Sequence, residues 1–175
     1  MKQKVDLRRL SDVAEVSSIA AASRRRAEWP ADFVELYEQR FGDLVRVAYL
    51  MTGNVGVAEE LTQDAFLAVR THIAEVTAPY PYLRAAVVNH ARSWHRRQRL
   101  ERRKRPDRPT SVVNEPDEMW DALQNLGVRR RTAIVLRFYE QLPDAEIAEI
   151  LDCAQATVRT LVRRGLADLR KVIEQ

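Results

Sequence analysis

"AEILDCAQATVRTLVRRGL" (residues 148–166) has the pattern of two helices joined by a tight turn. A helix-turn-helix needs small and apolar residues at fixed places, because its two helices cross steeply and approach closely. Between residues 147 and 161 that template is filled by Ile147, Ala148, Leu151, Cys153, Val158 and Leu161. Asp152 stands in the turn where glycine is commonest, and aspartate tolerates the left-handed backbone conformation better than most residues. The stretch therefore predicts a helix-turn-helix whose second helix starts near Ala154 or Gln155.

The positions that the template leaves outward are mostly polar, and their chemistry suits DNA. Arginine binds guanine or phosphate, glutamine binds adenine, and threonine binds either kind of group. The outward set is Gln155, Ala156, Arg159, Thr160 and Arg163. A basic surface helix on a purely structural bundle is the alternative. We favour a DNA-reading helix because the apolar template and the polar pattern occur together.

Around this motif the chain has the composition of an all-α protein. It has 175 residues, of which 46% are hydrophobic, with only five glycines and seven prolines. Apolar residues recur at steps of three and four, which predicts helices over 33–52, over 57–71 and from about Tyr82 past Arg97, and a further helix is expected over 128–142. The two prolines of 77–82 predict a break before the third helix. Asp144 and Glu146 fall in the expected first turn of the helix that opens the helix-turn-helix, where acidic residues are favourable. The proline-containing stretch 102–118 has no such stripe and indicates a linker. We expect two small helical domains joined by a flexible linker, divided as 1–29 (an extension of unknown role), 30–104, 105–116 (linker) and 117–175.

A basic cluster over residues 92–108 is the second signal for nucleic acid. Nine of its residues are Lys or Arg and two are acidic, so its net charge is 9 − 2 = +7, against +4 for the whole chain. Such a cluster attracts a phosphate backbone and makes binding sensitive to salt. Tyr80, Tyr82 and Trp94 lie nearby in sequence, and exposed aromatic rings stack on unpaired bases. For Trp94 taken alone, a place in the core is the favoured interpretation.

The predicted helix over 57–71 has a polar face with acidic and amide groups, formed by Glu59, Glu60, Gln63 and Asp64. In a protein that binds nucleic acid, such a face should point away from the phosphates. A protein partner and an ordinary solvated surface are equally good explanations on physical grounds.

The sequence contains no recognisable pattern of catalytic or metal-binding residues. The sequence has one cysteine, which excludes an intrachain disulfide, and its three histidines lack metal-ligand spacing. No phosphate-binding glycine loop and no pairing of a nucleophile with a base is present. We expect no catalytic activity, no cofactor, no metal and no small-molecule substrate. We also expect a cytoplasmic location, because no apolar run approaches the length of a membrane span and the N-terminus lacks a secretory signal.

Three segments in this order resemble the extracytoplasmic-function (ECF) sigma factors, the smallest group of the bacterial sigma-70 family. They are "FVELYEQRFGDLVRVAYLMTGNVGVAEELTQDAFLAV", "YPYLRAAVVNHARSWHRRQRLERR" and "LGVRRRTAIVLRFYEQLPDAEIAEILDCAQATVRTLVRRGLADLR". The resemblance covers almost all of residues 30–172. It implies a transcription initiation factor that brings core RNA polymerase to promoters and helps to open the DNA. It also implies contacts with the polymerase β′ clamp helices and β subunit, and an anti-sigma factor as inhibitor.

The same resemblance implies roles for matching positions. The face of Glu59, Glu60, Gln63 and Asp64 would dock on the β′ clamp helices. The downstream (−10) element and its opened strand would contact Tyr80, Tyr82, Asn89, Arg92, Arg96 and Arg97, with a flipped base held by the loop at about 75–81. The upstream (−35) element would be read by Gln155, Thr157, Arg159, Thr160, Arg163 and Arg164.

Three positions depart from the pattern of the family. Ala154 replaces a frequent serine cap, a loss that costs a helix about 1 kcal/mol. Ser93 and Leu161 stand where many members have an acidic residue and an arginine. These departures concern individual base contacts. A stand-alone helix-turn-helix regulator that binds duplex DNA without polymerase is the alternative function, and the whole first domain with its acidic face argues against it.

Overall fold

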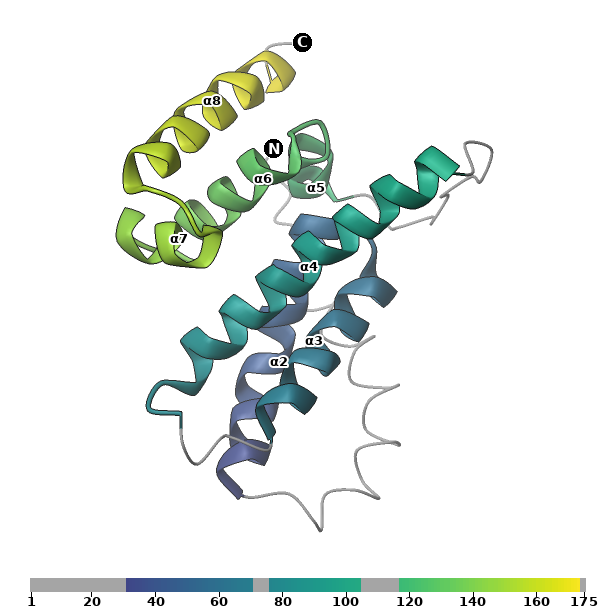
Figure 1. Ribbon diagram of the computed structural model, residues 1–175, viewed down its shortest axis with the longest axis vertical. Helices are drawn as coiled ribbons and strands as arrows, with labels where there is room; N and C mark the ends of the chain where they lie inside the picture. The colour runs from purple at the N-terminus through teal and green to yellow at the C-terminus, as the bar shows by residue number, and fades with distance from the viewer. Residues whose placement is uncertain (1–30, 71–75, 105–116, 174–175) are drawn as a thin grey trace, which may run out of the picture. The chain divides into compact units, whose positions relative to one another are not determined.

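The computed structural model describes residues 31–70, 76–104 and 117–173, and every element in these ranges is helical (Figure 1). The first two ranges contain α2 (Ala31–Thr52), α3 (Val55–Arg70) and α4 (Pro79–Lys104). The last range contains α5 (Glu118–Leu123), α6 (Val128–Ile134), the π-helical turn η3 (Val135–Tyr139), α7 (Asp144–Leu151) and α8 (Gln155–Ile173). The predicted all-α class is therefore confirmed.

The chain divides into two compact units, Met1–Asp43 and Leu44–Gln175. Of the first unit, the structure describes Ala31–Asp43, which forms the first part of α2. There the rings of Tyr37 and Phe41 stack with centroids 4.6 Å apart, one helical turn from each other. This spacing belongs to the predicted apolar stripe over 33–52, and the helix predicted there is confirmed.

In the second unit, α3 packs along α4 (Figure 1). The buried residues of α3 recur at helical spacing and form one face: Ala58, Leu61, Thr62, Ala65, Phe66 and Val69. The helix starts at a short connection after α2. Gly53 there has a φ of 71°, and the Asn54 side chain accepts a hydrogen bond from the Val57 N–H at 3.0 Å. Because glycine has no Cβ it adopts this left-handed conformation without strain, and Asn54 satisfies a donor that the new helix leaves open.

Helix α4 begins earlier than the sequence pattern predicted. We expected a proline-containing break over 77–82 and a helix from about Tyr82, but the helix starts at Pro79 and includes Pro81. Proline is tolerated there because the first turn of a helix does not use its N–H groups within the helix. The first backbone bond follows at once, from the Tyr82 N–H to the Ala78 carbonyl at 3.3 Å. Tyr80 and Tyr82 thus belong to a helical turn, and 71–75 lie outside the described residues.

Helices α5–α8 form a second group, in which α8 packs against α5, α6 and α7. Asp117 caps α5, since its Oδ1 accepts hydrogen bonds from the N–H groups of Met119 at 2.9 Å and Trp120 at 3.0 Å. Gly165 lets α8 approach α6 closely, because a Cβ there would lie only 2.8 Å from Cγ1 of Ile134. The connection between the helix groups, 105–116, lies outside the described residues.

The helix predicted over 128–142 changes its winding half-way. It is α-helical to Ile134 and π-helical over Val135–Tyr139, so that the Glu140 N–H bonds the Val135 carbonyl at 3.1 Å. The chain then leaves the helix through Gln141, whose φ is 56°. A π-turn inserts one extra residue and rotates the side chains that follow it, and such turns are frequent at functional sites. Here it leaves Leu136 buried and Phe138 exposed.

Candidate nucleic-acid interface

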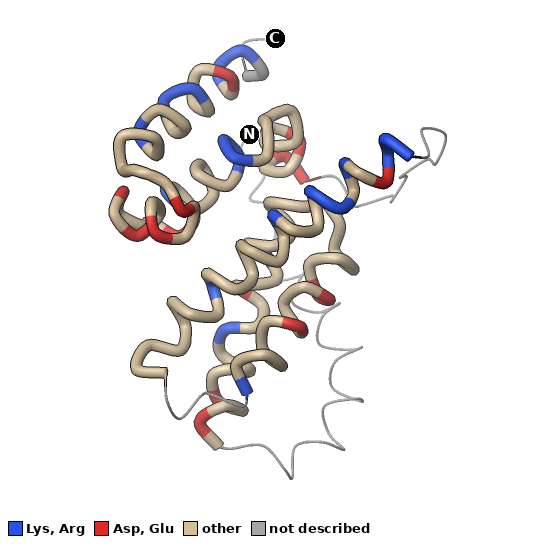
Figure 2. The backbone as a smooth tube through the Cα atoms, viewed as in Figure 1, with Lys and Arg blue, Asp and Glu red and all other residues tan. Residues whose placement is uncertain are grey.

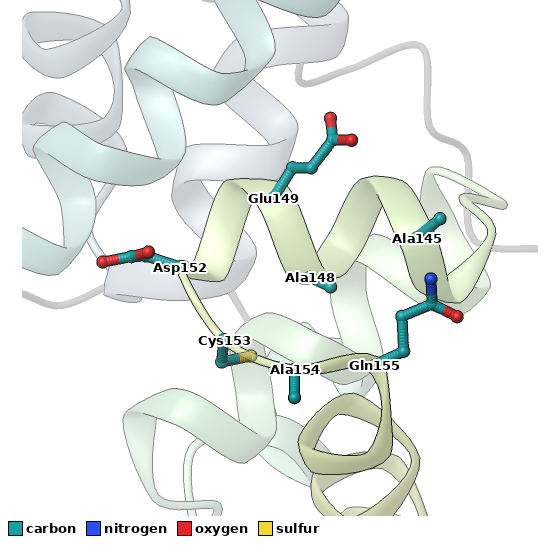
Figure 3. Close-up of a pocket in the computed structure, with 7 residues that line it drawn as sticks. All are labelled: Ala145, Ala148, Glu149, Asp152, Cys153, Ala154 and Gln155. Atoms are coloured by element: carbon teal, nitrogen blue, oxygen red, sulfur yellow. The ribbon is translucent and has the colours of Figure 1, made fainter.

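The elbow between α7 and α8 has the form that the template predicted. Ile147, Leu151 and Val158 are buried, while Leu161 is half-buried. Asp152 ends α7 in the left-handed conformation expected of it, with φ 50° and ψ 63°. Figure 3 shows side chains around an open hollow of about 470 Å³ on this elbow, lined by Ala145, Ala148, Glu149, Asp152, Cys153, Ala154 and Gln155.

Most of the residues predicted to read DNA lie exposed on α8, and basic positions recur along the helix (Figure 2). The exposed ones are Gln155, Thr157, Arg159, Arg163 and Arg164. Thr160 differs, because it is half-buried and its hydroxyl donates to the Ala156 carbonyl at 3.0 Å. Ala154 offers no side-chain cap, and its carbonyl accepts from the Thr157 N–H at 2.8 Å.

Arg159, a candidate for reading bases, is held by a carboxylate of α7. From the sequence, this carboxylate was expected only to favour the start of its helix. Asp144, in the first turn of α7, accepts a hydrogen bond from Nε of Arg159 at 3.1 Å. Its other oxygen lies 3.5 Å from Nη1 of Arg137. Arg159 is 68% exposed and Asp144 is 20% exposed, so the pair lies at the surface with the arginine outermost. The acid and the arginine are 15 residues apart in the chain, and only the fold of the elbow brings them together.

The described part of the basic cluster occupies the C-terminal end of α4 (Figure 2). Its exposed cations there are Arg96, Arg97, Arg99, Arg102, Arg103 and Lys104. Three of them fall in the last turn of the helix, where positive charge interacts favourably with the helix dipole. Arg105 and Arg108 of the predicted cluster lie outside the described residues.

The other residues predicted for the −10 element have different environments. Asn89 is exposed, and Tyr82 is 55% exposed. Arg92 is half-buried and donates to the Asn89 side chain at 3.3 Å and to the Ile150 carbonyl of α7 at 3.1 Å. The Tyr80 hydroxyl donates to the Glu140 carboxylate at 3.1 Å. Trp94 is half-buried, with its ring edge-on to that of His95 at 4.8 Å.

Most of the acidic and amide residues predicted to share a face of α3 are exposed, and acidic positions recur along this helix (Figure 2). Glu60, Gln63 and Asp64 are exposed, while Glu59 is half-buried and burial raises the pKa of its carboxyl. Leu67, 47% exposed, adds an apolar side chain on the same helix. A face that combines carboxylates with an exposed leucine is complementary to a basic, partly apolar surface on a protein partner.

Three buried charged side chains were missed by sequence reasoning. Arg131 is 7% exposed and donates to the carbonyls of Leu123, Gln124, Leu126 and Met51. Burial lowers its pKa to about 10. Arg84 and Glu140 form an ion pair with both side chains 7% exposed. For Arg84 a signal existed, since it stands among the apolar residues of its helix beside Leu83, where a solvated arginine does not belong.

No group of three or more His, Cys, Asp or Glu side chains with metal-binding geometry occurs among the described residues. Within the same ranges, none of the helices has the length and apolar character needed to cross a bilayer.

The comparisons with known proteins agree with this geometry. The family model for Sigma-70 region 2 matches residues 36–101, and the model for Sigma-70 region 4 matches 117–169. The RNA polymerase sigma-E factor of Streptomyces avermitilis is 30% identical over 155 residues, covering 82% of this chain and 86% of that protein. The ECF RNA polymerase sigma factor SigW of Bacillus subtilis is 26% identical over 165 residues, covering 81% and 87%.

The fold also matches a solved structure, that of the sigma factor RpoE in complex with the anti-sigma factor NepR from Bartonella quintana. The TM-score is 0.71 at 20% sequence identity, and the match covers 83% of this chain and 98% of that one.

Proposed function

The chain belongs to the ECF group of the sigma-70 family of RNA polymerase sigma factors, and from this premise we propose how its two matched regions divide the work of promoter recognition. The first domain, 30–104, contains region 2 and takes core-polymerase binding and DNA opening. The second, 117–175, contains region 4 and reads duplex DNA. The extension 1–29 and the linker 105–116 complete the division, which is supported by matches that stop at 101 and resume at 117.

In this proposal α8 lies in the major groove at the −35 element. The observation that carries it is the separation of faces at the elbow: Val158 is buried, whereas Gln155 and Arg159 are exposed on the same helix. A recognition helix enters the groove with its N-terminal residues against base edges. The full contact set is Gln155, Thr157, Arg159, Thr160, Arg163 and Arg164, with Thr160 acting after it exchanges its bond to Ala156.

The first domain holds the −10 element through α4. Asn89, Arg92, Arg96 and Arg97 supply polar contacts, and Tyr80 and Tyr82 supply aromatic ones. Opening DNA costs about 1.4 kcal/mol per base-pair step, and a protein that stacks or binds the released bases offsets part of this free energy. The exposed ring of Tyr82 and the exposed cations at the end of α4 support this role.

The outer face of α3 docks on core polymerase at the β′ clamp helices, through Glu59, Glu60, Gln63 and Asp64. This assignment is supported by the exposure of three of these side chains. The β subunit is a further contact. Sigma factors are regulatory initiation subunits, and we propose that this one acts in the cytoplasm, without catalysis, cofactor or small-molecule substrate of its own.

An anti-sigma factor is the proposed inhibitor. The support is the matching solved structure, in which a sigma factor is bound to an anti-sigma factor. The alternative of a stand-alone helix-turn-helix regulator does not account for the match to region 2 over 36–101.

The test is run-off transcription on a pool of genomic fragments with core polymerase, with and without the full chain. We expect promoter-specific transcripts only when the chain is present. Absence of such transcripts, together with no binding to core polymerase, would refute the proposal. Specific binding of a genomic duplex by the chain alone, with no effect on polymerase, would favour the stand-alone regulator.

A further inference from the structure

Arg137 lies inside the π-helical turn and is tied to the backbone that follows the turn. Its Nη1 donates a hydrogen bond to the Leu142 carbonyl at 2.9 Å. The Leu142 N–H in turn donates to the Leu136 carbonyl at 3.0 Å, and both leucine side chains are buried. The acceptor of Arg137 therefore belongs to a residue that the core holds in place. This gives the guanidinium a defined position although the Arg137 side chain is 39% exposed.

The same nitrogen of Arg137 lies beside the carboxylate of Asp144, in the first turn of α7. Its distance to Oδ1 is 3.5 Å, while Oδ2 accepts the hydrogen bond from Nε of Arg159 at 3.1 Å. Each oxygen of the carboxylate thus has its own guanidinium. The helices that carry these groups are in contact, because α7 packs against both the π-helical turn and α8. A restraint that begins at the core backbone therefore reaches an exposed side chain of α8 through two steps.

The charges of this trio (Arg137, Asp144 and Arg159) sum to +1. Asp144 and Arg159 alone would form a pair without net charge, and the carboxylate would offset the attraction of Arg159 for DNA. The second cation beside the acid restores the positive charge of the group. Asp144 can therefore restrain Arg159 while the group as a whole still attracts a phosphate backbone.

Two other arginines proposed for the −35 element, Arg163 and Arg164, are not restrained in this way. Both are exposed, and within the described ranges neither has a hydrogen bond or an ion pair. A long side chain that moves freely loses conformational entropy when DNA fixes it, whereas a restrained one loses less. A base contact also needs a defined geometry, while a phosphate contact carries no sequence information. The restrained Arg159 is therefore suited to bases, and the unrestrained pair is suited to phosphates.

We infer that Arg137 is a positioning residue for the −35 element: through Asp144 it holds Arg159 in one orientation, and so determines how strictly that arginine selects its base. Arg137 contacts no base itself. The inference rests on the proposed function, because it concerns a side chain assigned there to the −35 element. It adds a residue that lies outside the recognition helix to those that determine promoter specificity.

The test compares holoenzymes, each assembled from core polymerase and a full-length variant, on the promoter duplex recovered by run-off transcription. Competition with every single-base change in the −35 element measures discrimination at each position. Arg159→Ala identifies the position that Arg159 reads, because the discrimination of about 5- to 150-fold that a bidentate arginine provides is lost there. We expect Arg137→Gln to reduce discrimination at that same position by about two- to tenfold, which corresponds to the loss of one restrained side chain. Discrimination at the other positions should stay unchanged.

Three further variants separate positioning from charge and from general stability. Arg129→Gln, at an exposed position of α6, makes the same change in charge and should weaken matched and mismatched duplexes equally. Arg137→Lys should keep the discrimination of the parent, because a single nitrogen of Arg137 makes both contacts and lysine has one nitrogen at its end. The double variant Arg137→Gln/Arg159→Ala should discriminate as Arg159→Ala does, because a residue that acts through Arg159 has no effect in its absence.

Parent-like discrimination in Arg137→Gln overturns the inference, and so does an equal loss at every position. A further loss in the double variant, or a loss in Arg137→Lys as large as in Arg137→Gln, overturns it as well. Circular dichroism and binding to core polymerase check the fold of Arg137→Gln, and Arg137→Met, which keeps the aliphatic stem, replaces it if helix content falls. Run-off transcription by the parent separates these failures from a failure of the proposed function, which alone abolishes the transcripts.

Discussion

Asp144 on α7 accepts a hydrogen bond of 3.1 Å from Nε of Arg159 on α8. Because the bond uses Nε, the terminal nitrogens of the guanidinium are left for a bidentate contact with guanine, the commonest specific contact in the major groove. The carboxylate is itself fixed near Arg137, with 3.5 Å between the charged atoms. Asp144 thus restricts the side chain of Arg159, which the proposed function assigns to DNA, and the restriction is present in the free chain.

The first prediction concerns Asp144→Asn. We expect discrimination between the −35 sequence and single-base variants to fall by up to about 1–3 kcal/mol at the position that Arg159 contacts. Affinity for unrelated duplex should rise slightly, because one negative charge near the phosphates is removed. Competition binding on a promoter selected with the holoenzyme measures both. The control is Glu149→Gln, an exposed acid of the same helix, and equal behaviour of the two variants would contradict the positioning role.

Arg159→Ala tests the base contact itself. It should weaken −35 binding by about 1–3 kcal/mol and relax specificity at one position, with little change in binding to core polymerase. Arg170→Ala, an exposed arginine near the end of α8, is the matched control. Titration against promoter duplex and against core polymerase gives the two affinities. Loss of both to the same degree would indicate misfolding and remove the assignment.

Asp64→Arg tests the polymerase face of α3. Reversal of an exposed charge inside an interface places like charges opposite each other, which slows association and weakens the complex. We expect weaker binding to core polymerase with unchanged helix content. Glu118→Arg, an exposed acid on α5 with the same change in charge, should bind as well as the parent. Unchanged affinity of Asp64→Arg would exclude this face from the interface.

His95 makes the stability of the fold depend on pH. Burial lowers the pKa of its imidazole below the ordinary 6.5, and the charges of Arg131 and Arg102 act in the same direction. Below pH 6.5 the unfolded chain therefore binds this proton more readily than the folded one, so the free energy of unfolding falls as the pH falls. Denaturant titrations from about pH 7 to about pH 5 should show a steeper loss for the parent than for His95→Gln. Parallel curves would show that His95 contributes nothing.

Arg131 is the residue on which the α5–α6 connection depends. Replacement by leucine removes donors from four carbonyls, of which those of Met51 and Leu123 keep contacts with His95 and the Leu126 N–H. A buried acceptor that loses its partner costs about 1–3 kcal/mol. We expect Arg131→Leu to lower the free energy of unfolding by at least about 3 kcal/mol. Arg129→Leu, at an exposed position of the same helix, should change it little. Equal midpoints in urea for the two variants would contradict this account.

Features encoded within a few residues were predictable from the sequence. The elbow of α7 and α8 and the polar face of α3 follow from patterns that repeat every three or four positions, and the left-handed Asp152 follows from its place in the turn. The start of α4 was placed too late because prolines were read as helix breakers, although the first helical turn accepts them. The π-turn was missed because Val135–Tyr139 fits an α-helical pattern equally well.

Contacts between residues far apart in the sequence could not be predicted from it. Arg84 and Glu140 are 56 positions apart, and the sequence around either residue does not identify the other as its partner. A charged residue on an apolar face indicates that some partner exists, but its identity depends on how the helices pack. The same is true of Asp144 and Arg159, which sequence reasoning assigned to separate roles.

The bond between Arg92 and Ile150 lies within one chain, and this has a consequence for gene dosage. An intramolecular equilibrium does not shift when the protein is diluted or concentrated; only a ligand that prefers one state shifts it. The proportion of molecules in which this bond is formed is therefore the same at every cellular amount of the protein, and only a ligand that prefers the bonded or the unbonded state changes that proportion.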